Sequence, residues 1–269
     1  MVVYAGQGDP RRSMALLWRE RTEQRHPTPG PKPELSVDLV VRTAIEVADA
    51  QGLQALSMRA VGERLGRTAM SLYTYVAGKN ELIDLMYDHA FAELVEEVDQ
   101  RDRTHAPEEW REWVHAWVGA LWRFCLRHPW TLEISQARPV LGPNEYRLFE
   151  SLATVLHRAG LEPKAISSAF GSLSNLVRGM VRTAAEARQA TAVTGVAEDQ
   201  WWYARSARLE EVAPNFSERF PTLSLMTRSG AFTNDAPEEP YLEQEAWESL
   251  QFGLDALLEG IQRRIDSAN

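Results

Sequence analysis

The sequence predicts an all-α protein, in which an N-terminal three-helix helix-turn-helix domain is joined to a larger helical domain. Helix-capping residues and terminal glycines fall where runs of apolar residues with helical spacing begin and end. No alternating run of four or more β-branched residues competes with this pattern. A chain of 269 residues, 44% hydrophobic and 25% charged, has the length and composition to bury a helical core.

The composition indicates the cellular compartment of the protein. The one cysteine, Cys125, excludes an intramolecular disulfide framework and is typical of a reducing compartment. No stretch reaches the ~20 apolar residues of a membrane-spanning helix, and arginines interrupt the N-terminal segment where a signal peptide needs an apolar run. We therefore expect a cytoplasmic protein without a membrane partner.

Charge is unevenly distributed along this acidic chain, whose formal net charge is -9. Residues 1–80 contain 11 lysines and arginines against 8 acidic residues, whereas residues 81–269 contain 18 against 30. A basic-leaning first third indicates a head that binds a polyanion, although chance fluctuation along an acidic chain gives the same asymmetry.

Residues 1–33 are expected to form an irregular, flexible N-terminal arm. Four prolines between positions 27 and 33 forbid a continuous helix there. Met14, Leu17 and Trp18 nevertheless recur at helical spacing, which leaves open a short helix docked on the body. Six basic residues against three acidic ones also leave open an arm that lies along a polyanion.

Residues 34–80 are expected to form three short helices, followed by a connecting helix over residues 81–98. Each start is marked by a side chain that accepts a hydrogen bond from a free N–H group of the first turn, and glycines mark the stops of the first two. The expected helices begin after Ser36, Ser57, Thr68 and Asn80, and the first three end before Gly52, before Gly66 and at Val76.

The second and third of these helices have the features of a helix-turn-helix, which needs a tight glycine turn and a small residue where the helices cross. Gly66 supplies the turn and Gly62 the small residue. A spacing of about 100° per residue places Leu72 inward, and Met70 and Thr74 outward.

The outward face of the third helix is short, neutral and rich in hydroxyl groups. Such a face suits the floor of the DNA major groove, where methyl groups meet thymine and hydroxyls meet base edges or phosphates. Arg59, Tyr73 and Lys79 flank this face and are placed to hold the phosphate backbone. The alternative from these residues alone is a three-helix domain whose tyrosines simply cover its core.

Short motifs at set distances from the glycine turn carry a resemblance. They are Ala44-Ile45 and Gly52, Leu56-Ser57-Met58-Arg59, Leu65-Gly66, Ser71-Leu72-Tyr73-Thr74-Tyr75-Val76 and Lys79-Asn80-Glu81-Leu82. On these residues, the stretch from Leu35 to Leu94 resembles the DNA-binding domain of the tetracycline-repressor (TetR) family. The chain departs from the family pattern at Arg67, and from the tetracycline repressor itself at Ala69-Met70, so the base preference does not transfer.

The resemblance implies that double-stranded operator DNA is the partner of this head. It also assigns operator-facing positions residue by residue, and Arg67 joins them on the helical wheel. The expected DNA-binding residues are Arg59, Arg67, Thr68, Ala69, Met70, Ser71, Tyr73, Thr74, Tyr75 and Lys79.

Residues 81–269 are expected to form a helical ligand-binding and dimerisation domain. Five of the nine tryptophans lie between positions 110 and 130, most of them in an expected helix over residues 108–127. Large flat rings are well suited to form the walls of a cavity for flat or amphipathic molecules. A helix face rich in tryptophan is, however, also typical of a packed core. The residues proposed to meet a small-molecule ligand are Trp113, Trp117, Phe170, Asn175, Arg178 and Arg182.

Two further helices, over residues 163–188 and 241–265, are expected to form a homodimer. Small residues on one face of the first allow a second helix to approach closely, and the apolar stripe of the second is too wide for one partner. In the TetR family the corresponding helices pair with their symmetry mates, and Phe252-Gly253-Leu254-Asp255 resembles the C-terminal pattern of the tetracycline-repressor-like branch. The residues assigned to the interface are Gly171, Gly179, Leu250, Leu254, Leu258 and Ile261.

No catalytic or metal centre is predicted, and no cofactor. Glu112 and His115 have the Glu-x-x-His spacing of half a di-iron bundle motif, but its other copy, Glu23 to His26, lies in the proline-rich arm. Glycine-rich phosphate loops, cysteine pairs, His-Glu-x-x-His and Gly-x-Ser-x-Gly are absent from the sequence. Cys125 lies in an apolar helix, where a thiol is inert.

The function expected from these observations is a dimeric repressor that leaves its operator when a small hydrophobic or amphipathic inducer binds. Two alternatives stay open: an activator of the same architecture, and a helical small-molecule-binding module with a vestigial DNA head. For the arm over residues 1–33, insertion of arginine into a minor groove beside the operator is open as well.

Overall fold

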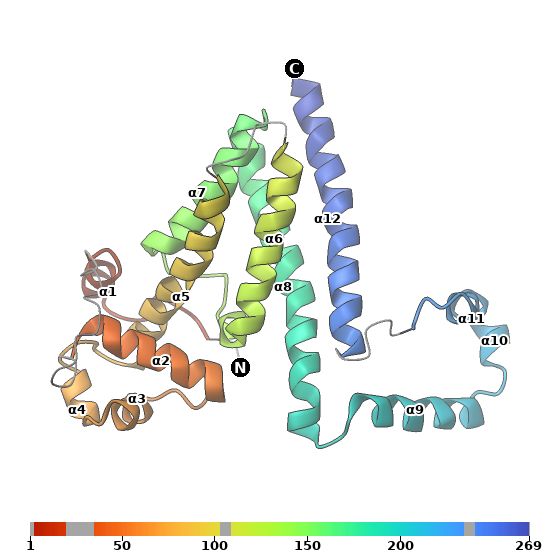
Figure 1. Ribbon diagram of the computed structural model, residues 1–269, viewed down its shortest axis with the longest axis horizontal. Coiled ribbons are helices and arrows are strands. Elements are labelled where there is room, and N and C mark those ends of the chain that lie inside the picture. The colour runs from red at the N-terminus through yellow and green to blue at the C-terminus, as the bar shows by residue number, and fades with distance from the viewer. Residues whose placement is uncertain (1–2, 20–34, 103–108, 234–239, 269) are drawn as a thin grey trace. The chain divides into compact units, whose positions relative to one another are not determined.

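The computed structural model confirms the all-α fold (Figure 1). The residues that it describes are 3–19, 35–102, 109–233 and 240–268. They form two compact units, one made of Met1–Arg178 with Ala256–Asn269 and the other of Gly179–Asp255. Within the described ranges, every helix is too short or too polar to cross a lipid bilayer.

The head consists of α2 (Val37–Gln51), α3 (Met58–Leu65) and α4 (Ala69–Leu72), and the structure confirms the capping expected for all three. Each capping hydroxyl accepts a hydrogen bond from the N–H group three residues ahead, which satisfies a donor that the helix leaves free. The donor–acceptor pairs, 3.1 to 3.3 Å apart, are Leu39 to Ser36, Ala60 to Ser57 and Ser71 to Thr68.

Two predicted boundaries in this region are wrong. The third helix ends at Leu72 and not at Val76, because the N–H group of Tyr75 bonds to the Leu72 carbonyl three residues back and tightens the chain into a turn. The aromatic and β-branched residues of this stretch have low helix propensity, which favours the early end. The next helix, α5 (Lys79–Asp102), begins two residues before the expected start, so Asn80 lies inside it and does not cap it.

The N-terminal segment is not wholly irregular, which corrects part of the expected arm. Pro10–Leu17 form α1, which packs against α5 and buries Leu17. The indole N–H group of Trp18 donates a hydrogen bond to the Leu141 carbonyl at 3.0 Å. The helical spacing of these apolar residues was the signal for a docked helix, and the structure favours that alternative. The proline-rich stretch, residues 27–33, lies outside the described residues.

Removing this segment is expected to lower the stability of the protein while leaving its salt-dependent DNA binding unchanged. A variant that begins at Lys32 loses the burial of Leu17 and the contact of Trp18, and we expect its free energy of unfolding to fall by about 2–3 kcal/mol. Urea denaturation and operator binding at several salt concentrations measure the two effects. A loss of affinity and salt slope at unchanged stability would place the segment along DNA instead.

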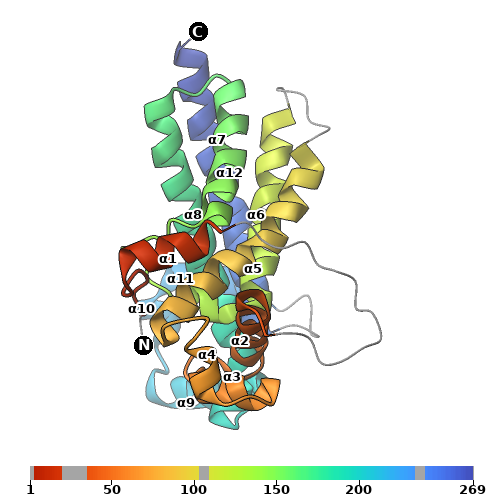
Figure 2. The ribbon, with the colours of Figure 1, turned by 90° about the vertical axis from the view of Figure 1, so that its left-hand side faces the viewer.

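Outside the head, α5 packs against α6 (Trp110–Arg127) and α7 (Pro143–Arg158), as Figure 2 shows. A short 3-10 helix, η2 (Pro129–Glu133), follows α6 and contacts α2. The N-terminal part of α8 (Pro163–Thr194) and the C-terminal part of α12 (Tyr241–Ala268) complete this unit. Both of these helices are longer at their C-terminal ends than the sequence pattern predicted.

The second unit contains the remaining parts of α8 and α12, with α9 (Glu198–Val212), α10 (Phe216–Arg219) and α11 (Pro221–Arg228) between them. Arg188 on α8 donates to the carboxylate of Glu243 on α12 at 2.6 Å, which joins these two helices within the unit. The sequence analysis assigned no element between α8 and α12, because apolar residues are scattered around the surface of α9 rather than gathered on one face.

Candidate functional site

The face of α4 that the sequence predicted to meet DNA is exposed. The Met70 side chain is 77% exposed and that of Tyr73 is 45% exposed, whereas Leu72 between them is fully buried. No acidic residue occurs from Arg67 to Val76, so nothing on α4 itself repels a phosphate. The other exposed side chains on this face are Arg67, Thr68 and Thr74.

Helices α3 and α4 cross closely, because Gly62 has no side chain at the crossing point. A Cβ atom on Gly62 would lie 2.8 Å from the carbonyl oxygen of Arg67 and 3.2 Å from the backbone nitrogen of Ala69. Gly66 turns the chain between the two helices at a φ of 65°, in the left-handed region that glycine adopts without strain. The two glycines therefore set the angle at which α4 faces outward.

Two predicted phosphate-binding cations already have partners inside the chain. The exposed Arg59 donates to the carboxylate of Glu63 at 2.7 Å, and this hydrogen bond and the charge of Glu63 raise the pKa of Arg59. The ammonium of Lys79 donates to the Leu53 carbonyl at 3.3 Å, which leaves its other N–H groups for a phosphate. The remaining predicted DNA-binding residues, which are half-buried, are Ala69, Ser71 and Tyr75.

A cavity of about 330 Å³ lies among α5, α6, α7 and α8 of the first unit. Its walls are mainly apolar and include six aromatic side chains. Neighbouring rings pack on each other: the ring centroids of Phe91 and Phe124 are 5.0 Å apart, and those of Phe149 and Phe170 are 4.5 Å apart. A flat, largely apolar molecule suits such walls. The aromatic lining residues are Tyr87, Phe91, Phe124, Tyr146, Phe149 and Phe170.

Two charged residues also line this cavity, Glu145 and Arg178. The guanidinium of Arg178 donates to three backbone carbonyls in and just after η2, those of Thr131, Leu132 and Ile134, at 3.3, 3.2 and 3.0 Å. Burial raises the pKa of the Glu145 carboxyl above its usual value. The cavity therefore offers one cation and one acid to the polar groups of a ligand.

Cys125 and Tyr87 line the cavity as buried, protonated groups. Burial raises the pKa of the Cys125 thiol to about 12 and lifts the pKa of Tyr87 well above its usual value. The Tyr87 hydroxyl accepts a hydrogen bond from the side-chain amide of Gln136 at 2.9 Å. A thiol with so high a pKa is a poor nucleophile, so Cys125 contributes to the wall rather than to covalent chemistry.

The structure brings two of the six predicted ligand residues, Phe170 and Arg178, to the cavity. Trp113 and Trp117 lie outside this lining, and each side chain is only 1% exposed. Trp117 lies behind the wall, with its ring centroid 6.2 Å from that of Phe170. Within the described residues, neither indole N–H group has a hydrogen-bond acceptor.

Asn175 and Arg182 also lie outside the cavity lining, and both side chains are exposed on α8. The side-chain amide of Asn175 donates to the Gly171 carbonyl at 2.8 Å. Arg182 forms an ion pair with Glu186, one turn further along the same helix, at 3.0 Å. Both contacts lie within α8.

The sequence analysis missed the lining residues on α5 and α7. Tyr87 and Phe91 are four residues apart, and Tyr146 and Phe149 are three apart, so each pair occupies one face of its helix. This spacing of aromatic residues was the signal that could have identified them.

Four of the six residues assigned to a dimer interface are instead buried within the single chain. The wide apolar stripe of α12 is covered by packing within the chain. These side chains, between 0 and 4% exposed, are Leu250, Leu254, Leu258 and Ile261. Gly171 and Gly179 lie on open parts of α8, where an added Cβ atom would meet nothing within 4 Å.

Sequence relatives place the chain in a family. The family model of the tetracyclin repressor-like C-terminal domain matches residues 104–265 of the chain. The chain belongs to the tetracycline-repressor family. The HTH-type transcriptional repressor DrrR1 of Streptomyces coeruleorubidus is 34% identical to this TetR chain over 269 residues, which is 98% of the chain and 92% of that protein. An HTH-type transcriptional regulator of Saccharopolyspora erythraea is 33% identical over 186 residues, 69% of this chain and 76% of the relative.

Solved TetR-family structures share the fold. Apo ActR from Streptomyces coelicolor aligns with a TM-score of 0.62 at 24% identity, over 89% of this chain and 100% of that one. ActR in complex with actinorhodin aligns with a TM-score of 0.63 at 24% identity, over 85% of this chain and 95% of that one. The TetR relatives are named as transcriptional regulators and not as enzymes.

Proposed function

We propose that this TetR protein is a cytoplasmic repressor that binds operator DNA as a homodimer through α3 and α4. A small hydrophobic or amphipathic molecule in the aromatic cavity releases it from the operator. The observation that carries this proposal is the course of α5. The helix begins at Lys79, directly after the DNA-facing residues, and its Tyr87 and Phe91 line the cavity.

The relatives support both halves of the proposal. DrrR1, similar over almost the whole chain, is named a repressor. ActR, similar in fold, has been solved in complex with actinorhodin. For this chain, the aromatic walls and the guanidinium of Arg178 favour a planar ligand that carries at least one oxygen able to accept a hydrogen bond.

A mobility-shift assay with the DNA upstream of the protein's own gene tests the first half. We expect a sequence-selective band whose affinity falls steeply with salt concentration, as phosphate contacts require. The absence of any salt-sensitive, sequence-selective band would favour a ligand-binding module with a vestigial head. Titration of the complex with actinorhodin, monitored by tryptophan fluorescence and by release of the DNA, tests the second half.

A further inference from the structure

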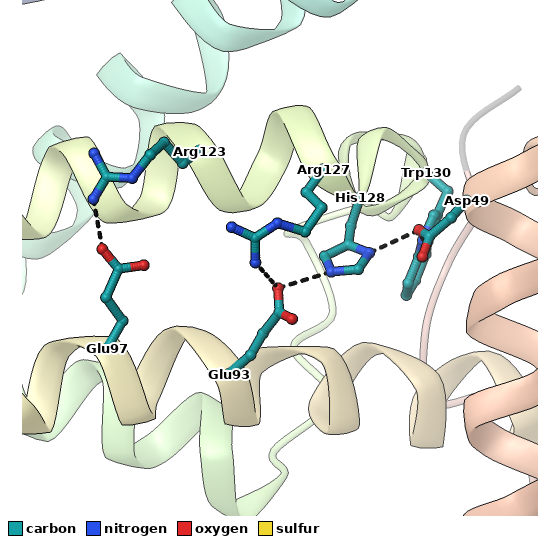
Figure 3. A network of polar contacts seen from close by, with 7 residues as sticks. All are labelled: Asp49, Glu93, Glu97, Arg123, Arg127, His128 and Trp130. Carbon is teal, nitrogen blue, oxygen red and sulfur yellow. Dashed lines mark hydrogen bonds and ion pairs between the residues drawn. The ribbon is translucent and has the colours of Figure 1, made fainter.

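A cluster of charged side chains around the buried His128 joins the head to the body (Figure 3). One oxygen of Asp49, near the end of α2, accepts from His128 Nδ1 and from Trp130 Nε1, both at 2.7 Å. One oxygen of Glu93, on α5, accepts from His128 Nε2 at 2.8 Å and from Arg127 at 2.7 Å. We call these five residues the His128 cluster.

The geometry requires His128 to carry a positive charge. Carboxylates only accept hydrogen bonds, so a ring with a carboxylate oxygen at each nitrogen must donate from both. Burial by itself would lower the pKa of His128, but the hydrogen bonds and charges of Asp49 and Glu93 outweigh burial and raise the pKa to about 9. Burial likewise opposes ionisation of Glu93, but His128 and Arg127 lower the pKa of that carboxyl overall.

Other charged and titratable groups lie close to His128 on the elements packed against it. They line a shallow cleft that opens beside the imidazole, and they are Arg42 and Glu46 on α2 and His89 and Glu96 on α5. Asp49 connects α2 to η2, because it accepts from His128 and Trp130, which lie on either side of Pro129.

The segment that follows His128 is also bound by Arg178, a residue of the cavity wall. Arg178 donates to carbonyls of Thr131, Leu132 and Ile134, and both Arg178 and Thr131 line the cavity wall. The η2 segment therefore makes polar contacts with two parts of the protein. Its carbonyls accept from Arg178 in the cavity wall, and its Trp130 donates to Asp49 in the head. Its carbonyls and the oxygen of a bound ligand compete for the same guanidinium.

We propose that η2 is the connection through which the cavity controls α2, with His128 and Arg178 as positioning residues at its two ends. A ligand oxygen that draws Arg178 away from the η2 carbonyls loosens η2, and the contacts of Trp130 and His128 with Asp49 weaken with it. This inference rests on the proposed function, but the connection between Arg178 and α2 is testable in the free protein without DNA.

The pH dependence of α2 is the first measurement. Because the folded pKa of about 9 lies above the ordinary value of 6.5, the stabilisation by His128 is fully present below pH 6.5 and is lost as the pH rises through 9. We expect the protection of α2 amides against hydrogen exchange, corrected for intrinsic exchange, to fall on the order of tenfold between pH 7 and pH 10. In His128→Gln this pH-dependent step should be absent. In Asp49→Asn the midpoint should move to lower pH.

Arg123→Gln is the matched control for the cluster. Arg123 pairs with Glu97 at 2.5 Å across the same two helices, α6 and α5, and this pair lies away from Asp49 (Figure 3). This variant should keep the wild-type pH profile of α2. If His128→Gln also keeps it, the cluster does not position α2 and the inference is wrong.

A double-mutant cycle between Arg178→Gln and Asp49→Asn tests the connection itself. We expect Arg178→Gln to speed exchange of α2 amides, and the two substitutions to be non-additive by about threefold or more. Arg182 lies one turn further along α8 and pairs with Glu186, so Arg182→Gln should leave α2 unchanged. Additivity within about twofold would overturn the connection. Failure of wild-type operator binding would overturn the proposed function alone, because the exchange measurements need no operator.

Discussion

Met70→Glu is expected to abolish operator-specific binding while leaving the head folded. The side chain is 77% exposed and contributes nothing to the core, so the substitution has little effect on the free energy of unfolding. In the complex, however, the new carboxylate faces a groove lined by phosphates. A like charge at an interface costs several kcal/mol, which at about 1.4 kcal/mol per tenfold amounts to at least ~100-fold in affinity.

Met70→Gln isolates the contribution of charge, because glutamine has nearly the shape of glutamate and no charge. We expect this variant to lose far less affinity, and to change which base is preferred opposite position 70, since it replaces a methyl contact by a hydrogen-bonding amide. Affinity for the wild-type operator and for operators changed one base pair at a time provides the measurement. Equal losses in the two variants would show that shape, and not charge, governs this position.

The head was predictable from the sequence because its signals are local. The hydroxyls of Ser36, Ser57 and Thr68 bond to N–H groups three residues ahead, and Gly66 acts at a single turn. Interactions of this kind are visible in a linear chain. The end of α4 was mispredicted for the same reason, since apolar spacing continues to Val76 through a turn that keeps the spacing without the helix.

The cavity was only partly predictable, because a helical wheel identifies residues that share a face but not the element that covers it. Trp113 and Trp117 share a face of α6, and the body covers that part of the face completely. The cavity begins one turn further along, at Leu121 and Phe124. Arg178 could be predicted as a polar residue near the cavity wall. Its hydrogen bonds to the carbonyls of η2 and of Ile134 could not be predicted, because these partners are 44 to 47 positions away in the sequence.

The His128 cluster gave no recognisable pattern in the sequence. Asp49 and His128 are 79 positions apart, and Glu93 and His128 are 35 apart. The dipeptide His128-Pro129 marked only the end of a helix, which the structure confirms. Only the fold, by packing α2 and α5 against the end of α6, brings two carboxylates to the two nitrogens of one imidazole.

The proposed dimer interface is the second place where a substitution is expected to have a large effect. Arginine at Leu254 or Leu258 would put an unpaired charge into the core of a single chain, so Leu258→Arg is expected to unfold the protein rather than separate subunits. A surface of the first unit suits a second copy better. A groove of about 280 Å³ between α8 and α12 is lined largely by small residues, including Ala165, Ser168, Ser172 and Gly260.

Gly260→Arg is therefore expected to produce folded monomers that bind operator weakly. An added Cβ atom on Gly260 meets nothing within 4 Å, so the single chain tolerates a side chain there, but a charged one fills the groove that a partner helix needs. A monomer reads one half-site and loses the effective concentration of the linked second head, which we expect to weaken binding by about 10²–10⁴-fold. Gln262→Arg, about 200° further around α12, is the control and should remain dimeric. Sedimentation velocity gives the oligomeric state and circular dichroism the fold; a Gly260→Arg variant that stays dimeric would move the interface away from this groove.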